Sequence, residues 1–483
     1  MAAFLPIPFG AVDEWAIFVF EAGTAVLFAL YLLGGQASRK TGDGIAGTVG
    51  NAGPGLRSDF RAFPAALKVL LGVFFAVAVI QVIPLPSGIV AVLSPRVAAL
   101  RGGMVELGLG EARWATLSIA SALSRGELVK YAAYALFAFI AYRSVRTRRE
   151  VETIVMAVGA AAVFEAAYGL VQVFGGTEMI FSYHKKWGLG SATGTYINRN
   201  HFAGFLEMAF PLVLGLLLAK ADFFSLGKRA RFRERILWFG QEKLQKTFLV
   251  GLMAAVIGLG LVFSRSRSGV LIFLLTVCVM VIALSAVGTG AGEPGMGKPG
   301  RRGRKLVRTV GLVVVLAAAV FGLRPVIDRF TRERLVLEDG RAHFFRVAGR
   351  IVREYPLAGT GNGTFALAYP MFEDRDLPVV VDHAHNDYLE SAAESGLVGA
   401  AALWLFFYGA FGLGLARWAK RRDPFVKGVG LGCLGGVAAL LLHSLTDFNL
   451  RIPANAAVFC LLIALLMRVT ALESRRQERE GVS

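Results

Sequence analysis

Eight consecutive residues, His383–Glu390 (His-Ala-His-Asn-Asp-Tyr-Leu-Glu), combine two imidazoles, a carboxamide and two carboxylates. A histidine titrates near neutral pH, so it can take a proton from a hydroxyl nucleophile as a general base. His-x-His flanked by Asp382 and Asp387 also offers side chains that zinc accepts. However, residues two apart face the same way on a strand and not on a helix, and the context is helical. The segment therefore predicts acid–base chemistry and no metal site.

Long apolar stretches surround this polar segment. Hydrophobic residues make up 55% of the 483 residues, charged residues 18%, and the mean hydropathy is +0.58. These values exclude an ordinary soluble domain and predict an all-α polytopic integral membrane protein with about 11–12 transmembrane helices. About eleven stretches are long enough to cross the hydrocarbon core. They lie near residues 14–34, 69–86, 128–145, 152–174, 201–219, 247–263, 268–287, 310–323, 395–416, 428–446 and 453–467.

Lys and Arg collect in alternate loops between these stretches. Positive residues resist translocation, so the basic loops predict the cytoplasmic side of the membrane. The outward segments are then 87–127, 175–200, 264–268, 324–394 and 447–452. Because the net charge of +18 is divided among short loops, we expect membrane lipids and no nucleic acid as a partner.

The stretches and loops predict three regions. Transmembrane helices occupy residues 1–323, a large outward loop containing short helices and the histidine motif occupies 324–394, and further transmembrane helices with a short basic cytoplasmic tail occupy 395–483. Within the loop, apolar residues recur at helical spacing over Gly340–Arg353, so a helix is expected there, ending at Pro356. The run 359–363 is predicted as a tight turn and not as a nucleotide-binding loop, because it lacks the preceding strand and the lysine.

The histidines and cysteines divide between loops and spans. All six histidines lie in outward segments or at the outer ends of spans: His184, His201, His343, His383, His385 and His443. This asymmetry indicates an outward-facing active site. The cysteines lie inside spans and predict neither a disulfide framework nor a cysteine metal site: Cys278, Cys433 and Cys460.

The polar motifs together resemble those of the O-antigen ligase and O-antigen polymerase family of bacterial envelope glycosyltransferases. The histidine motif lies directly before a span, as the family's motif does. Four further segments are similar to family signatures in the same order: Gly194–Gly204, Ser266–Gly269, Gly340–Arg341 with Tyr355–Gly361, and Leu445–Asn449 with Ile452–Asn455. Each motif alone is weak, and their shared order makes the resemblance specific.

The resemblance implies transfer of a glycan from undecaprenyl diphosphate to an acceptor sugar. The acceptor would be lipid A–core or a growing glycan, at the periplasmic face of the bacterial inner membrane. His385 matches the family position of the general base, and Arg341 and Arg267 are candidates to stabilise the diphosphate. Two guanidiniums can bind its oxygens bidentately, so no metal and no cofactor are expected. A direct displacement would invert the anomeric configuration.

Six further residues are candidate substrate ligands: Arg265, Asn198, Asn200, His201, His383 and Asn386. Arg265 and Arg267 share a short outer turn, and either can be the phosphate ligand; the family pattern favours Arg267. Asn198 and Asn200 fit a sugar or diphosphate contact and an ordinary helix cap about equally well. Glu165 and Glu207 lie inside spans, where an ionisable side chain usually faces a cavity or a partner.

The sequence leaves the reaction partly open. A ligase that moves a finished glycan, a polymerase that joins repeat units and an enzyme that glycosylates protein have overlapping motifs. A transporter of lipid-linked sugars is the alternative of another class, because Glu within spans and outward Arg also suit a translocation path. We find no correspondence between the two halves of the chain that would support a transporter.

Overall fold

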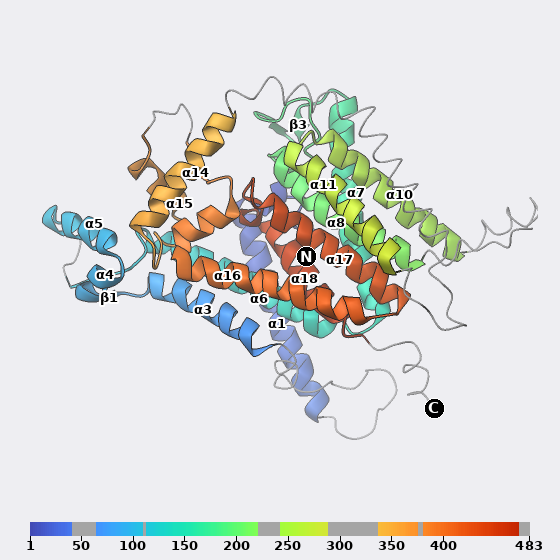
Figure 1. Ribbon diagram of the computed structural model, residues 1–483, viewed down its shortest axis with the longest axis horizontal. Helices are drawn as coiled ribbons and strands as arrows, with labels where there is room; N and C mark the ends of the chain where they lie inside the picture. Colours follow the sequence, from blue (N-terminus) through green and yellow to red (C-terminus); the bar gives the residue numbers. More distant parts are fainter. Residues whose placement is uncertain (41–63, 110–112, 221–241, 288–336, 375–379, 473–483) are drawn as a thin grey trace, which may run out of the picture. The chain divides into compact units, whose positions relative to one another are not determined.

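The computed structural model describes residues 1–40, 64–109, 113–220, 242–287, 337–374 and 380–472 (Figure 1). Helices dominate these residues. The strands among them form two short antiparallel pairs, β1 (Leu85–Pro86) with β2 (Trp114–Ala115) and β3 (Met179–Ile180) with β4 (Tyr183–His184). The predicted all-α class is confirmed.

Seven described helices are long and apolar enough to cross a membrane. They are α1 (Glu14–Lys40), α3 (Ala65–Val82), α7 (Arg148–Phe174), α8 (Arg199–Lys220), α10 (Glu242–Phe263), α16 (Asp387–Lys420) and α17 (Pro424–His443). Two further helices are apolar over shorter ranges: α11 (Arg267–Val287), over Arg267–Ala283, and α18 (Pro453–Val469). The predicted stretch 128–145 lies on α6 (Ser121–Ser144), and the stretch 310–323 lies outside the described residues. The chain is a polytopic membrane protein.

Several helix boundaries differ from the predicted stretches by a few residues, and two of the differences are informative. The stretch 69–86 is helical only to Val82, because Pro84 restricts the residue before it to extended conformations. Helix α16 begins at Asp387 and not near residue 395, so the second half of the histidine motif forms the first turn of the helix. The motif therefore lies partly inside the helix that was expected to follow it.

The helices group into two compact units. Unit 1 consists of Met1–Ile17, Ala141–Leu335 and Phe411–Ser483. Unit 2 consists of Phe18–Ile140 and Val336–Ala410. The division of the chain into regions 1–323, 324–394 and 395–483 stays a prediction.

Unit 1 is built around α8. This helix is almost entirely buried and packs against α7, α10, α11, α17 and α18 (Figure 1). Its closest neighbour is α17, where small residues face each other: a Cβ at Gly428 would lie 2.5 Å from the carbonyl oxygen of Gly215. Such glycines let membrane helices approach backbone to backbone. A short 3-10 helix, η1 (Phe9–Ala11), packs near α18 in this unit.

The two ends of unit 1 carry different chemistry. At one end, the segment before α8 meets the turn between α17 and α18, where Asn200 Nδ2 donates to Asp447 Oδ2 (2.6 Å). At the opposite ends of the helices, Arg148 at the start of α7 pairs with Asp423 before α17 (2.8 Å). Two of the segments predicted to face outward thus lie at one end of unit 1. Arg148 and Asp423, which border two loops predicted to be cytoplasmic, lie at the other end, as alternating membrane loops require.

Unit 2 combines membrane helices with the large loop. Phe20 of α1 and Phe74 of α3 contact aromatic rings of α6. The loop contributes α14 (Leu337–Glu354), α15 (Phe365–Ala368) and η4 (Tyr369–Met371), which pack with α4 (Ser87–Leu93) and α5 (Pro95–Glu106). We call the buried side chains they share the loop core: Val90, Val97, Leu117, Val347, Ala348, Ile351, Tyr355, Phe365, Ala368, Tyr369, Val381, Ala384 and Ala393. The helix predicted within 340–353 is confirmed and ends before Pro356.

The glycine run 359–363 is a buried turn, as predicted. Gly359, Gly361 and Gly363 all have positive φ, which L side chains rarely adopt. The turn packs on a kink of α16 at Gly396, and the N–H of Thr360 donates to the carbonyl of Ala393 (2.9 Å). The kink frees backbone carbonyls of α16, and the turn supplies N–H partners for them.

Candidate active site

Residues 383–386, which we call the histidine turn, precede α16 and are held by Glu390, whose side chain is 1% exposed. Its carboxylate lies 2.8 Å from Nδ1 of His383 and accepts the N–H of Ala384 at 2.8 Å. These contacts connect the turn to the first turn of α16. His385 has φ 52°, an uncommon conformation for a residue with a side chain. The positive φ is consistent with a side chain that the turn holds in one direction.

Asn386 caps α16. Its Oδ1 accepts the N–H groups of Tyr388 and Leu389, both at 3.0 Å. This is the usual way in which Asn satisfies the first free N–H groups of a helix. The predicted substrate ligand Asn386 therefore has a clear structural role, and its contact with substrate stays a prediction.

Helix α14 brings Phe344 onto His385. The two rings are stacked, with centroids 5.8 Å apart and planes within 21° of parallel. Arg341 lies three residues before Phe344, on the same face of α14. The structure therefore puts the face of α14 that carries Arg341 beside His385, although the two are separated by more than forty residues of sequence.

The far part of α14 is fixed by charge as well as by the loop core. Arg350 pairs with Asp374 at 2.7 Å, and Nδ1 of His343 lies 3.4 Å from the same carboxylate. The hydrogen bond from Arg350 holds the pKa of Asp374 below its ordinary value. Burial, together with Glu373 and Asp374 nearby, raises the pKa of Tyr369 to about 12. Tyr369 therefore stays neutral in the loop core at physiological pH.

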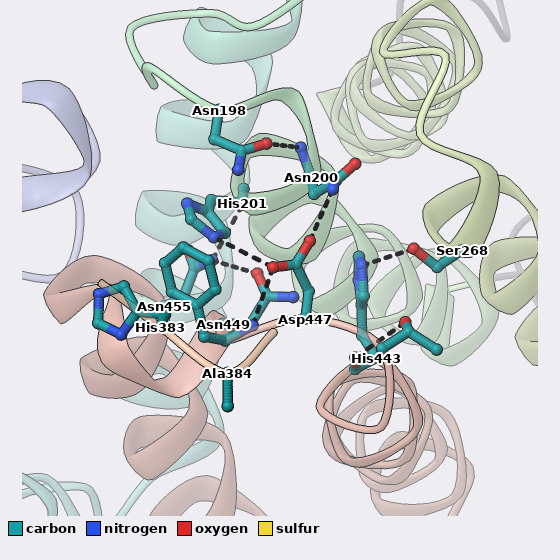
Figure 2. Close-up of polar contacts among 12 residues, drawn as sticks. Asn198, Asn200, His201, Ser268, His383, Ala384, His443, Asp447, Asn449 and Asn455 are labelled. Atoms are coloured by element: carbon teal, nitrogen blue, oxygen red, sulfur yellow. Dashed lines mark hydrogen bonds and ion pairs between the residues drawn. The ribbon is translucent and has the colours of Figure 1, made fainter. Parts of the chain in front are cut away.

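Asn198 and Asn200 lie at the start of α8 in unit 1 (Figure 2). Asn198 Oδ1 accepts the N–H of Asn200 (2.9 Å), so Asn198 caps the helix. Asn200 Nδ2 donates to Asp447, which is fully buried. A carboxylate only accepts hydrogen bonds, so Asp447 fixes the orientation of the Asn200 amide. Its oxygen then points away from Asp447.

His201 is buried in the same cluster. Its Nε2 lies 3.7 Å from Asp447 Oδ1, and its ring meets Phe448 edge to face at 4.5 Å. The backbone carbonyl of His201 accepts Asn455 Nδ2 (2.9 Å). His201 therefore ties the start of α8 to the turn before α18.

The turn between α17 and α18 packs closely on α8. It contains η5 (Asn449–Arg451), and Asn449 Oδ1 accepts Asn455 Nδ2 at 3.0 Å. A Cβ at Gly204 would collide with the Asn449 side chain, so a glycine is needed there. Tyr196 completes the contact by donating to Asn455 Oδ1 (3.1 Å).

Arg265 and Arg267 flank the start of α11. Arg265 has φ 54°, and a Cβ at Gly190 would lie 3.3 Å from its Nη1. Glu178 is close to the same guanidinium. Burial opposes its ionisation, but hydrogen bonds from Lys185 and from the N–H of Gly190, with the charges of Lys185 and Arg265, lower the pKa of Glu178 overall. Arg265 thus has a carboxylate neighbour, and Arg267 is the first residue of α11.

Three polar side chains from three helices form a hydrogen-bonded series at the start of α11, and Figure 2 shows its link between His443 and Ser268. Glu207 Oε2 of α8 lies 3.0 Å from Nδ1 of His443 on α17, and Nε2 of His443 lies 3.0 Å from Ser268 Oγ on α11. The partner expected for Glu207 is therefore His443. Glu165 also has a protein partner, because its carboxylate accepts the N–H and the hydroxyl of Thr195, each at 2.8 Å.

The predicted site residues fall into two groups. His383, His385, Asn386 and Arg341 lie in unit 2, and the other five lie in unit 1: Asn198, Asn200, His201, Arg265 and Arg267. Reasoning from sequence did not single out Phe344, Asp447 or Ser268. A buried ionisable residue within a span was the available signal for Glu207, and nothing local identified its partner. Among the described residues, no cluster of His, Cys, Asp or Glu could hold a metal ion.

Residues 249–404 match the family model described as O-antigen ligase. The matched segment includes α11, α14, the histidine turn and the first half of α16. The chain carries an O-antigen ligase family domain. The resemblance inferred from the motifs is confirmed, and the domain is that of a ligase- or polymerase-type membrane glycosyltransferase of polysaccharide biosynthesis. A comparison with curated proteins gives no match.

Proposed function

We propose that this protein transfers a glycan from undecaprenyl diphosphate to an acceptor sugar at the periplasmic face of the bacterial inner membrane. The acceptor is lipid A–core or a growing glycan. The observation that supports the proposal best is the stacking of Phe344 on His385, which brings the Arg341 face of α14 to a histidine. Phe344, His385 and Arg341 all lie in the segment that matches the family.

His385 acts as the general base. The acceptor hydroxyl attacks the anomeric carbon of the donor, a new glycosidic bond forms, and the bond between that carbon and the diphosphate oxygen breaks. His385 takes the hydroxyl proton, and the diphosphate leaves with the bonding electron pair. A single displacement inverts the anomeric configuration.

Arg341 and Arg267 bind the diphosphate as its charge grows. A guanidinium presents parallel N–H donors that match two phosphate oxygens, and such charge-assisted bonds are stronger than neutral ones. Their strength increases as negative charge develops on the leaving group, which is the requirement for catalysis. The proposed mechanism uses no metal and no cofactor. Arg265 is a secondary ligand, since Glu178 already balances part of its charge.

Asn198 and Asn200 bind sugar hydroxyls and not the diphosphate. Their amides are half-buried, and their hydrogen bonds leave one donor, Asn198 Nδ2, and one acceptor, Asn200 Oδ1, without a partner among the described residues. A sugar hydroxyl can both accept and donate, so this pair suits it. The buried carboxylate of Asp447 would repel an anionic diphosphate here.

The remaining candidates, His383, His201 and Asn386, differ in how far they are exposed to substrate. The His383 side chain is 28% exposed, so its ring can reach substrate while Nδ1 stays on Glu390. His201 and Asn386 are at least nine-tenths buried. Their main contribution is to hold the turns that carry Asn200 and His385.

Glycan transfer by the purified, detergent-solubilised protein tests the proposal. An undecaprenyl diphosphate oligosaccharide serves as donor, with lipid A–core or the donor itself as acceptor, and products are resolved by size. A single addition to lipid A–core indicates a ligase, and a ladder of repeats indicates a polymerase. Added chelator should leave the rate unchanged. If the folded protein transfers glycan with none of the donor and acceptor pairs tested, the proposal is refuted and the transporter alternative is favoured.

A further inference from the structure

The hydrogen-bonded series Glu207–His443–Ser268 has no role in the mechanism above, although burying its ionisable side chains is energetically unfavourable. Glu207 is 1% exposed and His443 is fully buried, and both lie in helices that are long and apolar enough to cross a membrane. Glu207 Oε1 is buried without a hydrogen-bond partner among the described residues. Ionisable side chains within membrane spans are usually functional, because removing them from water is unfavourable.

An ordinary explanation is that this hydrogen-bonded series only links three helices. That explanation accounts for Glu207 and His443, which join α8 to α17. It does not account for the hydrogen bond between His443 and Ser268, because α11 already packs on α8. A Cβ at Gly269 would lie 2.7 Å from the Cβ of Ala203, so the first turn of α11 is in close contact with α8 without any polar link.

The last member of the series, Ser268, lies beside Arg267 in the first turn of α11. Ser266 Oγ accepts the N–H of Gly269 (3.2 Å), which caps α11. Ser268 is bonded to His443, so hydrogen bonds fix the residues on both sides of Arg267. The same glycine position would bring a Cβ within 3.0 Å of Glu207 Oε1, so the carboxylate also contacts this first turn directly.

We propose that Glu207, His443 and Ser268 are positioning residues that hold the first turn of α11 so that Arg267 binds the diphosphate. Glu207 orients the imidazole through Nδ1, and Nε2 then meets the Ser268 hydroxyl in one direction. Such a supporting hydrogen bond reduces the side-chain and backbone freedom that diphosphate binding must otherwise remove. The inference rests on the proposed role of Arg267.

Inhibition by undecaprenyl diphosphate, which contains the diphosphate and no sugar, tests the inference. Ser268→Ala should raise the inhibition constant about 3- to 10-fold, the loss expected for one hydrogen bond, while the KM for acceptor stays unchanged. Ser268→Thr keeps a hydroxyl and should restore the wild-type constant. Ser444→Ala is the matched control, because the buried Ser444 hydroxyl is next to His443 and has no hydrogen-bond partner among the described residues.

The same substitutions in an Arg267→Ala background separate the two proposals. Arg267→Ala should itself weaken inhibition, and Ser268→Ala should then add nothing, because the group it positions is gone. If Arg267→Ala leaves inhibition unchanged, the role of Arg267 in the proposed function is wrong. If Arg267→Ala weakens inhibition but Ser268→Ala does not, the positioning role is wrong. It is also wrong if Ser268→Ala raises the inhibition constant of undecaprenyl diphosphate and the KM for acceptor by the same factor.

Discussion

The aromatic ring of Phe344 on α14 stacks on the imidazole of His385, with centroids 5.8 Å apart. His385 lies in a turn at positive φ, and this ring contact helps to hold the turn, together with the bonds of Glu390 to the preceding residues and the Asn386 cap. The contact also relates His385, the proposed base, to Arg341, which lies one helical turn before Phe344 on the same face of α14. A change at Phe344 should therefore act on catalysis through His385.

Phe344→Ala should lower kcat without removing either proposed catalytic group, His385 or Arg341. A stacked ring pair contributes about 0.5–1.5 kcal/mol, so losing it should cost roughly 2- to 12-fold in kcat. Steady-state transfer assays measure the change. Phe344→Tyr keeps the stacking ring and is the control, expected to stay near wild type. Equal loss in both variants would mean that the hydrophobic fit of α14, and not stacking on His385, controls the rate.

Arg341→Lys should reduce kcat/KM by roughly 100-fold although it keeps the charge. An ammonium is a point charge and cannot reproduce the paired N–H donors of the guanidinium. Arg346→Lys on the same helix is the control, because the exposed Arg346 side chain bonds only to the helix backbone among the described residues. Wild-type kinetics for Arg341→Lys would remove Arg341 from the diphosphate site.

Asp447→Asn should weaken glycan binding selectively. The new amide can donate as well as accept, so it no longer fixes the Asn200 amide with its oxygen outward. We expect the KM of one glycan substrate to rise about 10-fold, the scale of one charge-assisted hydrogen bond. Inhibition by undecaprenyl diphosphate should not change. Asp13→Asn, an exposed substitution in the same unit, is the control. If diphosphate inhibition weakens instead, Asn200 is not a sugar ligand.

The pair Arg350–Asp374 should make the loop more stable above the ordinary pKa of the carboxyl than below it. The pKa of Asp374 is lowered in the folded protein, so its stabilising contribution is present above 3.8 and is lost as pH falls through the folded value. The difference in Tm between wild type and Asp374→Asn should therefore shrink from about pH 5 to about pH 3. Glu373→Gln, at the adjacent residue, should show no such trend. A pH-independent difference would exclude the ion pair as its cause.

Much of the fold follows from hydropathy, because a membrane helix needs a long apolar stretch and little else. That is why α7, α8 and α10 lie where the sequence predicts them. Interruptions of the pattern were harder to place. The kink at Gly396 depends on N–H groups supplied by the 359–363 turn, and α4 and α5 take their position from the loop core; neither requirement has a local sequence signal.

The candidate site was predictable where its residues are neighbours in sequence. The motif itself identifies His383, His385 and Glu390 together. The pair Asn200–Asp447 joins residues 247 positions apart, and Glu207–His443 joins residues 236 apart. Both members of the first pair lie in motifs that resemble family signatures, but no spacing rule relates them. Only packing of α8 against α17 and the following turn brings these side chains together.

Transfer from an undecaprenyl diphosphate glycan by purified His385→Ala protein tests the central claim most directly. Removing a general base typically costs about 10²- to 10⁴-fold in rate, so transfer should fall by that factor while inhibition by undecaprenyl diphosphate stays as in wild type. His184→Ala, which removes an exposed histidine from another segment predicted to face outward, should transfer at the wild-type rate. Transfer by His385→Ala within a few-fold of the His184→Ala rate would contradict the account, because another group would then have to accept the proton.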